Sequence, residues 1–191
     1  KFRIRSLVGL IPLFAVERLE ESWIEPFTEF RKNLRWFVQN RAAHVRECVH
    51  TVERDGEVTH VLTILNQEQL RRLTQRLRDP EEFLSDYGIR SLSRAHRDDP
   101  FILDGNCVGY EPAESTNALF GGNSNWRGPI WFPVNYLLIE SLQKFHHYFG
   151  DEFQVECPTG SGQMMNLWEV ATELSRRLSS VFLQRDGRRA V

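Results

Sequence analysis

The sequence predicts a mainly α-helical protein that carries one inserted β-hairpin, and three observations support this fold class. Apolar residues recur at i, i+3 and i+4 spacing in several segments, which is the pattern of amphipathic helices. Two of these segments begin with a capping box, in which Asn66 is followed by Gln69 and Asn166 by Glu169. The clearest hairpin signal is the Asp-Gly pair at residues 55–56, which has β-branched residues on both sides.

Length and composition indicate one soluble globular domain. The chain has 191 residues, a net charge of −2 and 41% hydrophobic residues. Charges of both signs are interspersed, so nucleic acid is not an expected partner. No apolar run reaches the roughly 18 residues that a membrane-spanning helix needs. Because the sequence lacks an initiator Met and a signal peptide and ends in a turn at residues 184–189, we expect a piece of a longer protein, with the rest of that protein as its partner.

The cysteines and histidines indicate neither a disulfide framework nor a metal site. Cys48, Cys107 and Cys157 are odd in number and form no Cys-x-x-Cys pair, which favours a reducing compartment and predicts a cytoplasmic protein. The histidines lack the spacing of metal ligands, and the adjacent His146 and His147 belong to different faces of one helix. We therefore expect no metal and no other cofactor.

The first 64 residues predict two helices and then the hairpin. Pro12 suits a first helical position, so a short helix is expected to run from there to about residue 19. A second helix covers about residues 26–39, and the hairpin is an insertion within about residues 46–64. The residues expected to pack inward are Leu7, Leu10, Ile11 and Phe14 around the start of the first helix and Phe27, Phe30, Leu34, Phe37 and Val38 in the second.

The middle of the chain predicts a helix that opens at Asn66, a short helix that starts at Asp79 and ends at Gly88, and then a long ordered loop. Residues 88–128 show little periodicity but keep too many apolar residues for disorder. We expect the loops at about residues 86–130 and 154–165 to line a site. Glu111 and Glu114 lie in the first of these loops, but neighbours on one short segment seldom face each other across a bond, so they are not the preferred acid/base pair.

Residues 121–136 are the most informative stretch of the chain. They combine two tryptophans, an arginine and several side-chain amides just before a helix that is expected to run from Pro129 to Tyr148, with Gly150 as its C-terminal stop. Indole rings cover the apolar face of a sugar, while Arg and Asn side chains hydrogen-bond to its hydroxyls. The pattern favours a neutral, hydroxyl-rich ligand. The alternative is that this aromatic loop only covers the top of a helical core. The last predicted helix, opened by Asn166, presents Leu167, Ala171, Leu174, Leu178, Val181 and Phe182 on one side.

Four stretches of the chain resemble glycoside hydrolase family 63, which includes the processing α-glucosidases of glycoprotein glycans and a bacterial glucosidase branch related to mannosylglycerate hydrolase. They are residues 5–13, 82–93, 121–136, which contain the sequence Trp-Arg-Gly-Pro-Ile-Trp, and 156–162. The resemblance implies that residues 1–191 are part of a C-terminal catalytic domain with an (α/α)6 toroid fold. A toroid of this kind has about twelve helices, so the chain would form roughly half of one. We expect a half toroid to fold poorly alone, because it exposes helix faces that the other half would cover.

The resemblance also implies a reaction, which is hydrolysis of an α-glycosidic, in particular an α-glucosidic, bond with inversion. One carboxylic acid protonates the glycosidic oxygen, and a second carboxylate activates water on the opposite face of the sugar. By resemblance, the substrate-binding residues are Trp126, Arg127, Trp131, Asn123, Asn125, Arg90 and Ser91.

The family's catalytic carboxylates are not evident in the sequence. In the family the acid is an Asp from the early half of the toroid, and the base is a Glu that precedes a glycine-rich stretch and Gly-Trp-Thr. Neither pattern occurs here, so both carboxylates are expected outside the chain, and Glu156, which precedes a glycine-rich turn, is the candidate base within it. Two alternatives remain open. The chain is either a non-catalytic carbohydrate-binding or scaffold module, or part of a toroid with another reaction, such as a phosphorylase or an epimerase with His96 as its catalytic histidine.

Overall fold

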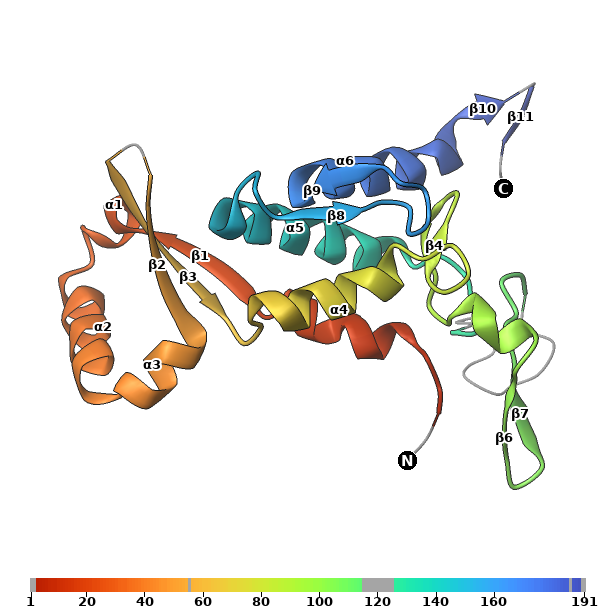
Figure 1. Cartoon of the computed structure of the whole chain (residues 1–191), viewed down its shortest axis with the longest axis horizontal. Helices are drawn as coiled ribbons and strands as arrows, with labels where there is room; N and C mark the ends of the chain where they lie inside the picture. The colour runs from red at the N-terminus through yellow and green to blue at the C-terminus, as the bar shows by residue number, and fades with distance from the viewer. Residues whose placement is uncertain (1–2, 55, 115–125, 186, 190–191) are drawn as a thin grey trace.

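Two long helices, α5 (Phe132–Phe149) and α6 (Leu167–Ser179), lie side by side at the centre of the molecule (Figure 1). Helix α4 (Gln67–Leu77) and the 3-10 helix η1 (Leu7–Phe14) complete the central group, and side chains from all four elements share one hydrophobic core. The computed structural model describes residues 3–54, 56–114, 126–185 and 187–189. Its mainly helical character agrees with the sequence analysis, while the toroid stays a prediction.

The predicted helix ends are confirmed at three places. Asn66 accepts a hydrogen bond from the Gln69 amide at 2.9 Å, and the Gln69 side chain accepts one from the Asn66 amide at 2.9 Å. Asn166 and Glu169 form the same reciprocal pair at the start of α6. Helix α5 ends at Gly150 with a φ of 70°, which a glycine adopts without strain. It starts at Phe132 rather than at Pro129.

The predicted hairpin is confirmed, but it belongs to a three-stranded antiparallel sheet. Strands β2 (Val49–Arg54) and β3 (Glu57–Thr63) form the hairpin, and β1 (Val16–Glu20) pairs with the other edge of β3, from Val16 opposite Thr63 to Glu20 opposite Thr59. The prediction that a helix extends to residue 19 is therefore wrong. The free edge of β3 offers these residues main-chain hydrogen-bond partners, which an isolated sequence pattern cannot reveal.

Helix η1 also differs from the expected α-helix, and the difference changes which residues are buried. A 3-10 helix has three residues per turn, so Leu7, Leu10 and Leu13 lie on one face and are all buried. Ile11, which an α-helical repeat would place inward, is about half exposed.

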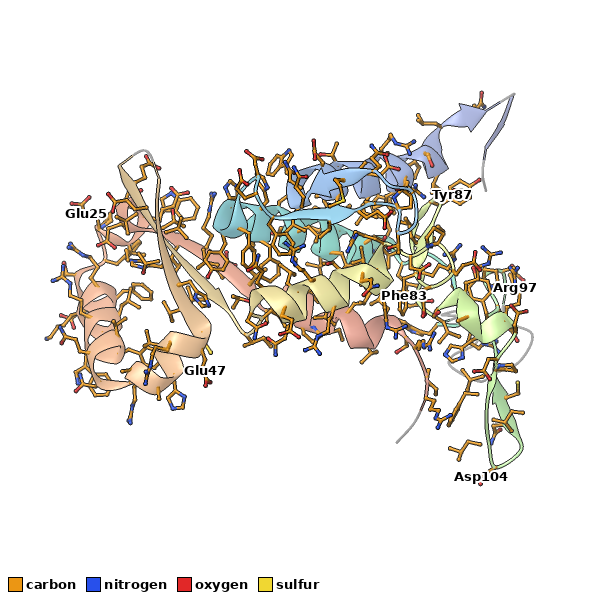
Figure 2. The ribbon with its side chains drawn as sticks, in the orientation of Figure 1. Glu25, Glu47, Phe83, Tyr87, Arg97 and Asp104 are labelled. Carbon is orange, nitrogen blue, oxygen red and sulfur yellow. The ribbon has the colours of Figure 1, made fainter. Side chains whose placement is uncertain are left out.

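Four more short hairpins contradict the expectation of a single hairpin. One of them, β4–β5 (Leu84–Ser85 and Gly88–Ile89), replaces the helix predicted from Asp79, because the Asp79 carbonyl accepts hydrogen bonds from the amides of Glu82 and Leu84 and so closes a turn. Figure 2 shows Tyr87 at its tip near the end of α6, and Asp104 at the tip of β6–β7, far from the central helices. The other three hairpins are β6–β7 (Phe101–Leu103 and Asn106–Val108), β8–β9 (Gln154–Glu156 and Met164–Asn166) and β10–β11 (Gln184–Arg185 and Arg188–Arg189).

The second predicted helix forms, but its apolar stripe is not buried. Helix α2 (Thr28–Asn40) lies with α1 (Glu21–Ile24) and α3 (Ala42–Cys48) on the side of the three-stranded sheet that faces away from the central helices (Figure 1). No residue of α2 is buried. At the other end of the chain, Phe182 in the 3-10 helix η3 (Ser180–Phe182) is also exposed, although the helical pattern predicted it inside. The remaining 3-10 helix is η2 (Arg94–Arg97).

Candidate functional site

The start of α5 is joined to strand β5 by the side chain of Asn135. Its Oδ1 accepts a hydrogen bond from the Ile89 amide at 2.6 Å, and its Nδ2 donates to the carbonyls of Ile89 and Trp131, both at 3.0 Å. Asn135 is buried, so these bonds are shielded from water. The side chain thus fixes two segments relative to β5, which are the first turn of α5 and the end of the loop that carries Trp126 and Trp131, called the tryptophan loop below.

Two glycines let the segments of this junction approach closely. Gly88 has a φ of +124°, and a Cβ there would lie 2.7 Å from Asn135 Oδ1. Gly128 has a φ of +137°, and a Cβ there would lie 2.5 Å from a ring carbon of Tyr110. Both positions therefore require glycine for conformational and for steric reasons.

Arg127 lies inside this junction rather than on its surface. The residue is fully buried, and its guanidinium forms an ion pair with Glu111 at 2.8 Å, while the Glu111 amide donates a hydrogen bond to the Arg127 carbonyl. A buried guanidinium requires such a partner because an uncompensated charge in the interior is costly. Glu111 is thus the counter-ion of Arg127 in this structure. Glu114, its predicted companion, is exposed.

Arg90 and Ser91 lie on the neighbouring loop, as expected. Both residues contact main-chain groups of the tryptophan loop. Ser91 is buried, its amide donates to the Pro129 carbonyl at 3.1 Å, and its hydroxyl accepts from the Gly128 amide at 3.0 Å. The Arg90 guanidinium donates to the Tyr110 hydroxyl at 3.0 Å and to the carbonyls of Pro80 and Leu84. Both side chains therefore hold loops together.

Trp126 and Trp131 form the aromatic part of the site. Their rings stack with centroids 3.8 Å apart and an interplanar angle of 24°, and both side chains are partly exposed. The Trp131 carbonyl accepts a hydrogen bond from the Asn135 amide at 3.0 Å, so this ring is attached to the helix start. The structure brings together five of the predicted residues at this junction (Arg90, Ser91, Trp126, Arg127 and Trp131). The predicted Asn123 and Asn125 lie outside the described residues.

Glu156 ends strand β8 and faces the glycine-rich turn that follows it. Its Oε1 accepts a hydrogen bond from the Gly162 amide at 2.6 Å. Hydrogen bonds from the amides of Gly160 and Gly162, aided by the positive charge of Arg78, hold the pKa of this carboxyl below its usual value. The side chain lines an open pocket of ≈ 300 Å³ together with Arg71, Arg78 and Met164. A carboxylate that stays ionised and reaches solvent can accept a proton.

Glu82 is not recognisable as a candidate in the sequence, yet its carboxylate bonds to side chains from distant segments. The buried carboxylate accepts hydrogen bonds from the guanidinium groups of Arg5 and Arg76 and from the Ser93 hydroxyl, each at 2.5 Å. These partners come from three separate segments of the chain. No periodicity or spacing around Glu82 predicts such a cluster, so only the tertiary structure could reveal it.

His96 is buried beside this cluster, and both of its ring nitrogens are engaged by the main chain. Nε2 accepts a hydrogen bond from the Arg5 amide at 2.9 Å, so Nδ1 carries the proton and donates to the Asp99 carbonyl at 2.9 Å. This arrangement gives His96 a structural role and does not support the alternative in which it is a catalytic histidine. Among the described residues, no group of three or more His, Cys, Asp and Glu side chains is arranged to hold a metal ion.

Comparison with known proteins identifies the class of this chain. Residues 57–160 match the model of the glycosyl hydrolase family 63 C-terminal domain, which is more than half of the sequence, and the chain belongs to this family. The matched segment includes the β2–β3 hairpin's second strand, the Asn135 junction and Glu156. In the described part of the chain, no helix combines the length and the apolar character needed to cross a membrane.

Three yeast proteins are similar to the chain. An uncharacterized protein of Saccharomyces cerevisiae is 47% identical over 98% of the chain, which covers 18% of that protein. The mannosyl-oligosaccharide glucosidase of the same yeast is 33% identical over 42% of the chain, and a probable mannosyl-oligosaccharide glucosidase of Schizosaccharomyces pombe is 36% identical over 39%. Each glucosidase match covers 7% of that protein. The chain thus spans less than a fifth of the length of the curated relatives that it matches.

Proposed function

We propose that this chain forms a wall of the sugar-binding pocket of an enzyme that hydrolyses an α-glucosidic bond with inversion. The observation that carries the proposal is the partly exposed, stacked pair of Trp126 and Trp131 at the start of α5. Membership of glycosyl hydrolase family 63 and the similarity to two proteins named as mannosyl-oligosaccharide glucosidases support a glucose-containing oligosaccharide as the substrate. Flat aromatic surfaces suit the apolar faces of sugar rings.

The predicted site residues divide into two roles in this proposal. Trp126 and Trp131 contact the sugar, with Asn123 and Asn125 of the same loop as further hydroxyl-binding groups. Arg90, Ser91 and Arg127 hold the loop in place, because their polar atoms already bond to neighbouring segments. This support matters because a misplacement of about 1 Å can reduce an enzyme's rate by roughly a hundredfold.

Glu156 is the residue of this chain that we propose as the general base. An inverting enzyme needs an ionised carboxylate that activates water, roughly 6.5–9.5 Å from the acid. The lowered pKa of Glu156 keeps it ionised, as a base must be, although it also lowers its basicity, and Figure 1 shows the β8–β9 turn at the end of the α5–α6 pair where α5 begins. The catalytic acid is expected from another part of the full-length protein.

Steady-state kinetics of the full-length protein with an α-glucoside test the proposed pocket wall formed by Trp126 and Trp131. Trp126→Ala removes the stacking surface, and Arg127→Ala leaves Glu111 without its counter-ion, so each is expected to lower kcat/KM by roughly tenfold or more. Trp126→Phe keeps an aromatic face and serves as the control, with a smaller loss. Wild-type kcat/KM in both alanine variants would remove these residues from the site.

The role of Glu156 has its own test. Glu156→Gln keeps the size of the side chain but cannot accept the proton, so kcat should fall by about 10²–10⁴-fold with little change in substrate binding. Because the base acts only when ionised and its pKa is lowered, kcat/KM should fall with decreasing pH only below the usual carboxyl value of 4.5. An unchanged kcat in Glu156→Gln would assign the base to another residue.

The alternative is a non-catalytic carbohydrate-binding module, and the hydrogen bond from the Gly162 amide to Glu156 favours it, because a purely structural turn would make the same bond. Under this alternative the full-length protein binds the oligosaccharide through Trp126 and Trp131 without cleaving it. Product analysis by NMR separates the two functions. Release of β-glucose as the first product supports inverting hydrolysis of an α-glucoside, and binding without any released glucose supports the module.

A further inference from the structure

A second pocket lies at the opposite end of α5 from the tryptophan loop. It has a volume of ≈ 240 Å³ and is formed where the last turns of α5 meet strand β1, helix α1 and the start of α6. Lys144 joins two of these elements through an ion pair with Glu17 at 2.9 Å. The side chains that shape the pocket are Glu17, Arg18, Trp23, Glu140, Lys144 and Trp168.

Two tryptophans with large exposed areas line this pocket. Trp23 in α1 is 51% exposed, and Trp168 in the first turn of α6 is 43% exposed. Each ring is also held in place by a neighbour, since the guanidinium of Arg18 lies 5.3 Å from the Trp23 centroid and the His147 ring lies 6.0 Å from that of Trp168. Exposed indoles of fixed orientation are costly in water unless a ligand covers them.

The charges around the two rings balance. Glu17 and Glu140 carry two negative charges, and Arg18 and Lys144 carry two positive ones. Lys144 pairs with both carboxylates, at 2.9 Å and 3.3 Å. Burial opposes the ionisation of Glu17 and of Lys144, but hydrogen bonds outweigh it. The pKa of Glu17 is lowered by hydrogen bonds from the Arg18 amide and from Lys144, and that of Lys144 is raised by its bonds to Glu17 and Glu140. The pocket therefore offers a neutral ligand several donors and acceptors.

The combination of exposed indole rings with paired charges favours a sugar over an apolar protein surface as the ligand of this pocket. Covering the pocket with apolar side chains would remove both ion pairs from water, at a cost of several kcal/mol per charge. A sugar instead replaces water with hydroxyl groups that bond to the carboxylates, to Lys144 and to the amide of Gln143, which also lines the pocket. Its apolar ring face covers an indole at the same time.

We propose that the pocket between Trp23 and Trp168 is a second binding site for a neutral oligosaccharide. It is separate from the Trp126–Trp131 site, because the α5 residues that line it, Glu140 to His147, follow Trp131 by nine to sixteen positions, or about 14–24 Å at 1.5 Å per residue. The site anchors a glycan on this face of the protein and does not depend on whether the chain takes part in hydrolysis.

The experiment uses the full-length protein and maltoheptaose, a neutral glucan oligosaccharide, in calorimetric titrations. Trp23→Ala and Trp168→Ala, on two different elements, are each expected to weaken one maltoheptaose site at least roughly tenfold, which is the loss of about 1.4 kcal/mol of stacking. The matched control is Trp36→Ala, because Trp36 is 54% exposed and lies beside Arg41, but belongs to α2 and not to the pocket. This control should bind like the wild type.

Two readouts keep this proposal apart from the proposed hydrolysis. The Trp23 and Trp168 variants should keep the wild-type kcat/KM for a short α-glucoside and the wild-type melting temperature within error, whereas Trp126→Ala should lose kcat/KM and keep the second maltoheptaose site. Equal maltoheptaose binding in all three variants, Trp23→Ala, Trp168→Ala and Trp36→Ala, would contradict the proposal of a second site. So would a result in which neither Trp23→Ala nor Trp168→Ala weakens a maltoheptaose site. Both conclusions hold whatever the kinetic measurements show.

Discussion

At the scale of single residues, Glu82 and its neighbour Glu81 show how burial changes the contribution of an ion pair to the stability of the protein. The side chain of Glu82 is 9% exposed and bonds to Arg5, Arg76 and Ser93, whereas that of Glu81 is 77% exposed and pairs only with Arg94 at 3.1 Å. Water reaches the carboxylate of Glu81 freely, whereas it reaches the Glu82 pairs mainly from the side of the half-exposed arginines. Two adjacent glutamates therefore have different roles, since Glu82 stabilises the folded structure and Glu81 contributes to solubility.

We expect Glu82→Gln to destabilise the chain by about 1.5–3 kcal/mol, because two guanidinium groups lose their charged acceptor. Glu81→Gln, the matched control, should change the free energy of unfolding by about 0–1 kcal/mol. Urea denaturation followed by circular dichroism measures both. Equal effects of the two substitutions would mean that the Glu82 cluster is as hydrated in solution as the surface pair.

Residue-level constraints also explain why the tryptophan loop has a defined shape. Gly88 and Gly128 bring β5, Tyr110 and the start of α5 within van der Waals distance, and Asn135 then forms hydrogen bonds with three main-chain groups. The sequence indicated the importance of this stretch by its tryptophans and amides. It did not indicate that Arg127 points inward, because the counter-ion Glu111 is sixteen residues away along a loop without periodicity.

At the scale of elements, the capping boxes are the features that the sequence predicted most directly. The reciprocal hydrogen bonds of a capping box connect residues only three positions apart, so their geometry depends on local backbone alone. The same locality made the Asp-Gly hairpin predictable. The Asp104-Gly105 pair at the tip of β6–β7 is an equivalent signal, with positive φ at both residues, and could have predicted a second hairpin.

Helix α6 provides the element-scale prediction. Asn166→Ala removes the acceptor for the Glu169 amide and should lower stability by about 1 kcal/mol. Asn166→Asp keeps an acceptor and adds a negative charge at the helix N-terminus, which the helix dipole favours, so it should retain wild-type stability. Thermal melting of the three proteins measures the effect. A loss of similar size in Asn166→Asp would point to the bond between Asn166 and Asp151 instead of the cap.

At the scale of the whole molecule, the chain divides its apolar side chains between a well-packed centre and an uncovered periphery. Phe145, Phe153, Leu138 and Leu142 of the centre and the leucines of α6 are buried, while none of the residues of α2 is. The exposed face of α2 agrees with the expectation that this chain leaves helix faces uncovered. Contiguous apolar surface of this kind promotes association in water.

Substitutions in the two regions should therefore have opposite consequences for the 191-residue chain. Phe30→Lys, at a position that is 46% exposed in α2, should reduce light scattering and dye binding while barely changing the melting temperature. Phe145→Ala, at a fully buried position of α5, should cost about 3–5 kcal/mol of stability. If Phe30→Lys unfolded the chain as readily as Phe145→Ala, then α2 would have to pack against another surface in solution.

By itself the sequence determined the features that arise from neighbouring residues. These are the amphipathic helices with their caps and the hairpin formed by β2 and β3, together with the family that residues 57–160 match. The tertiary structure alone decided that residues 16–20 form a strand, that the α2 stripe stays exposed, that Arg127 and Glu82 are buried among distant partners, and that Trp23 and Trp168 share a pocket. The physical reason is that caps and turns depend on local hydrogen bonds, whereas burial, ion pairing and strand addition depend on which segments meet in space.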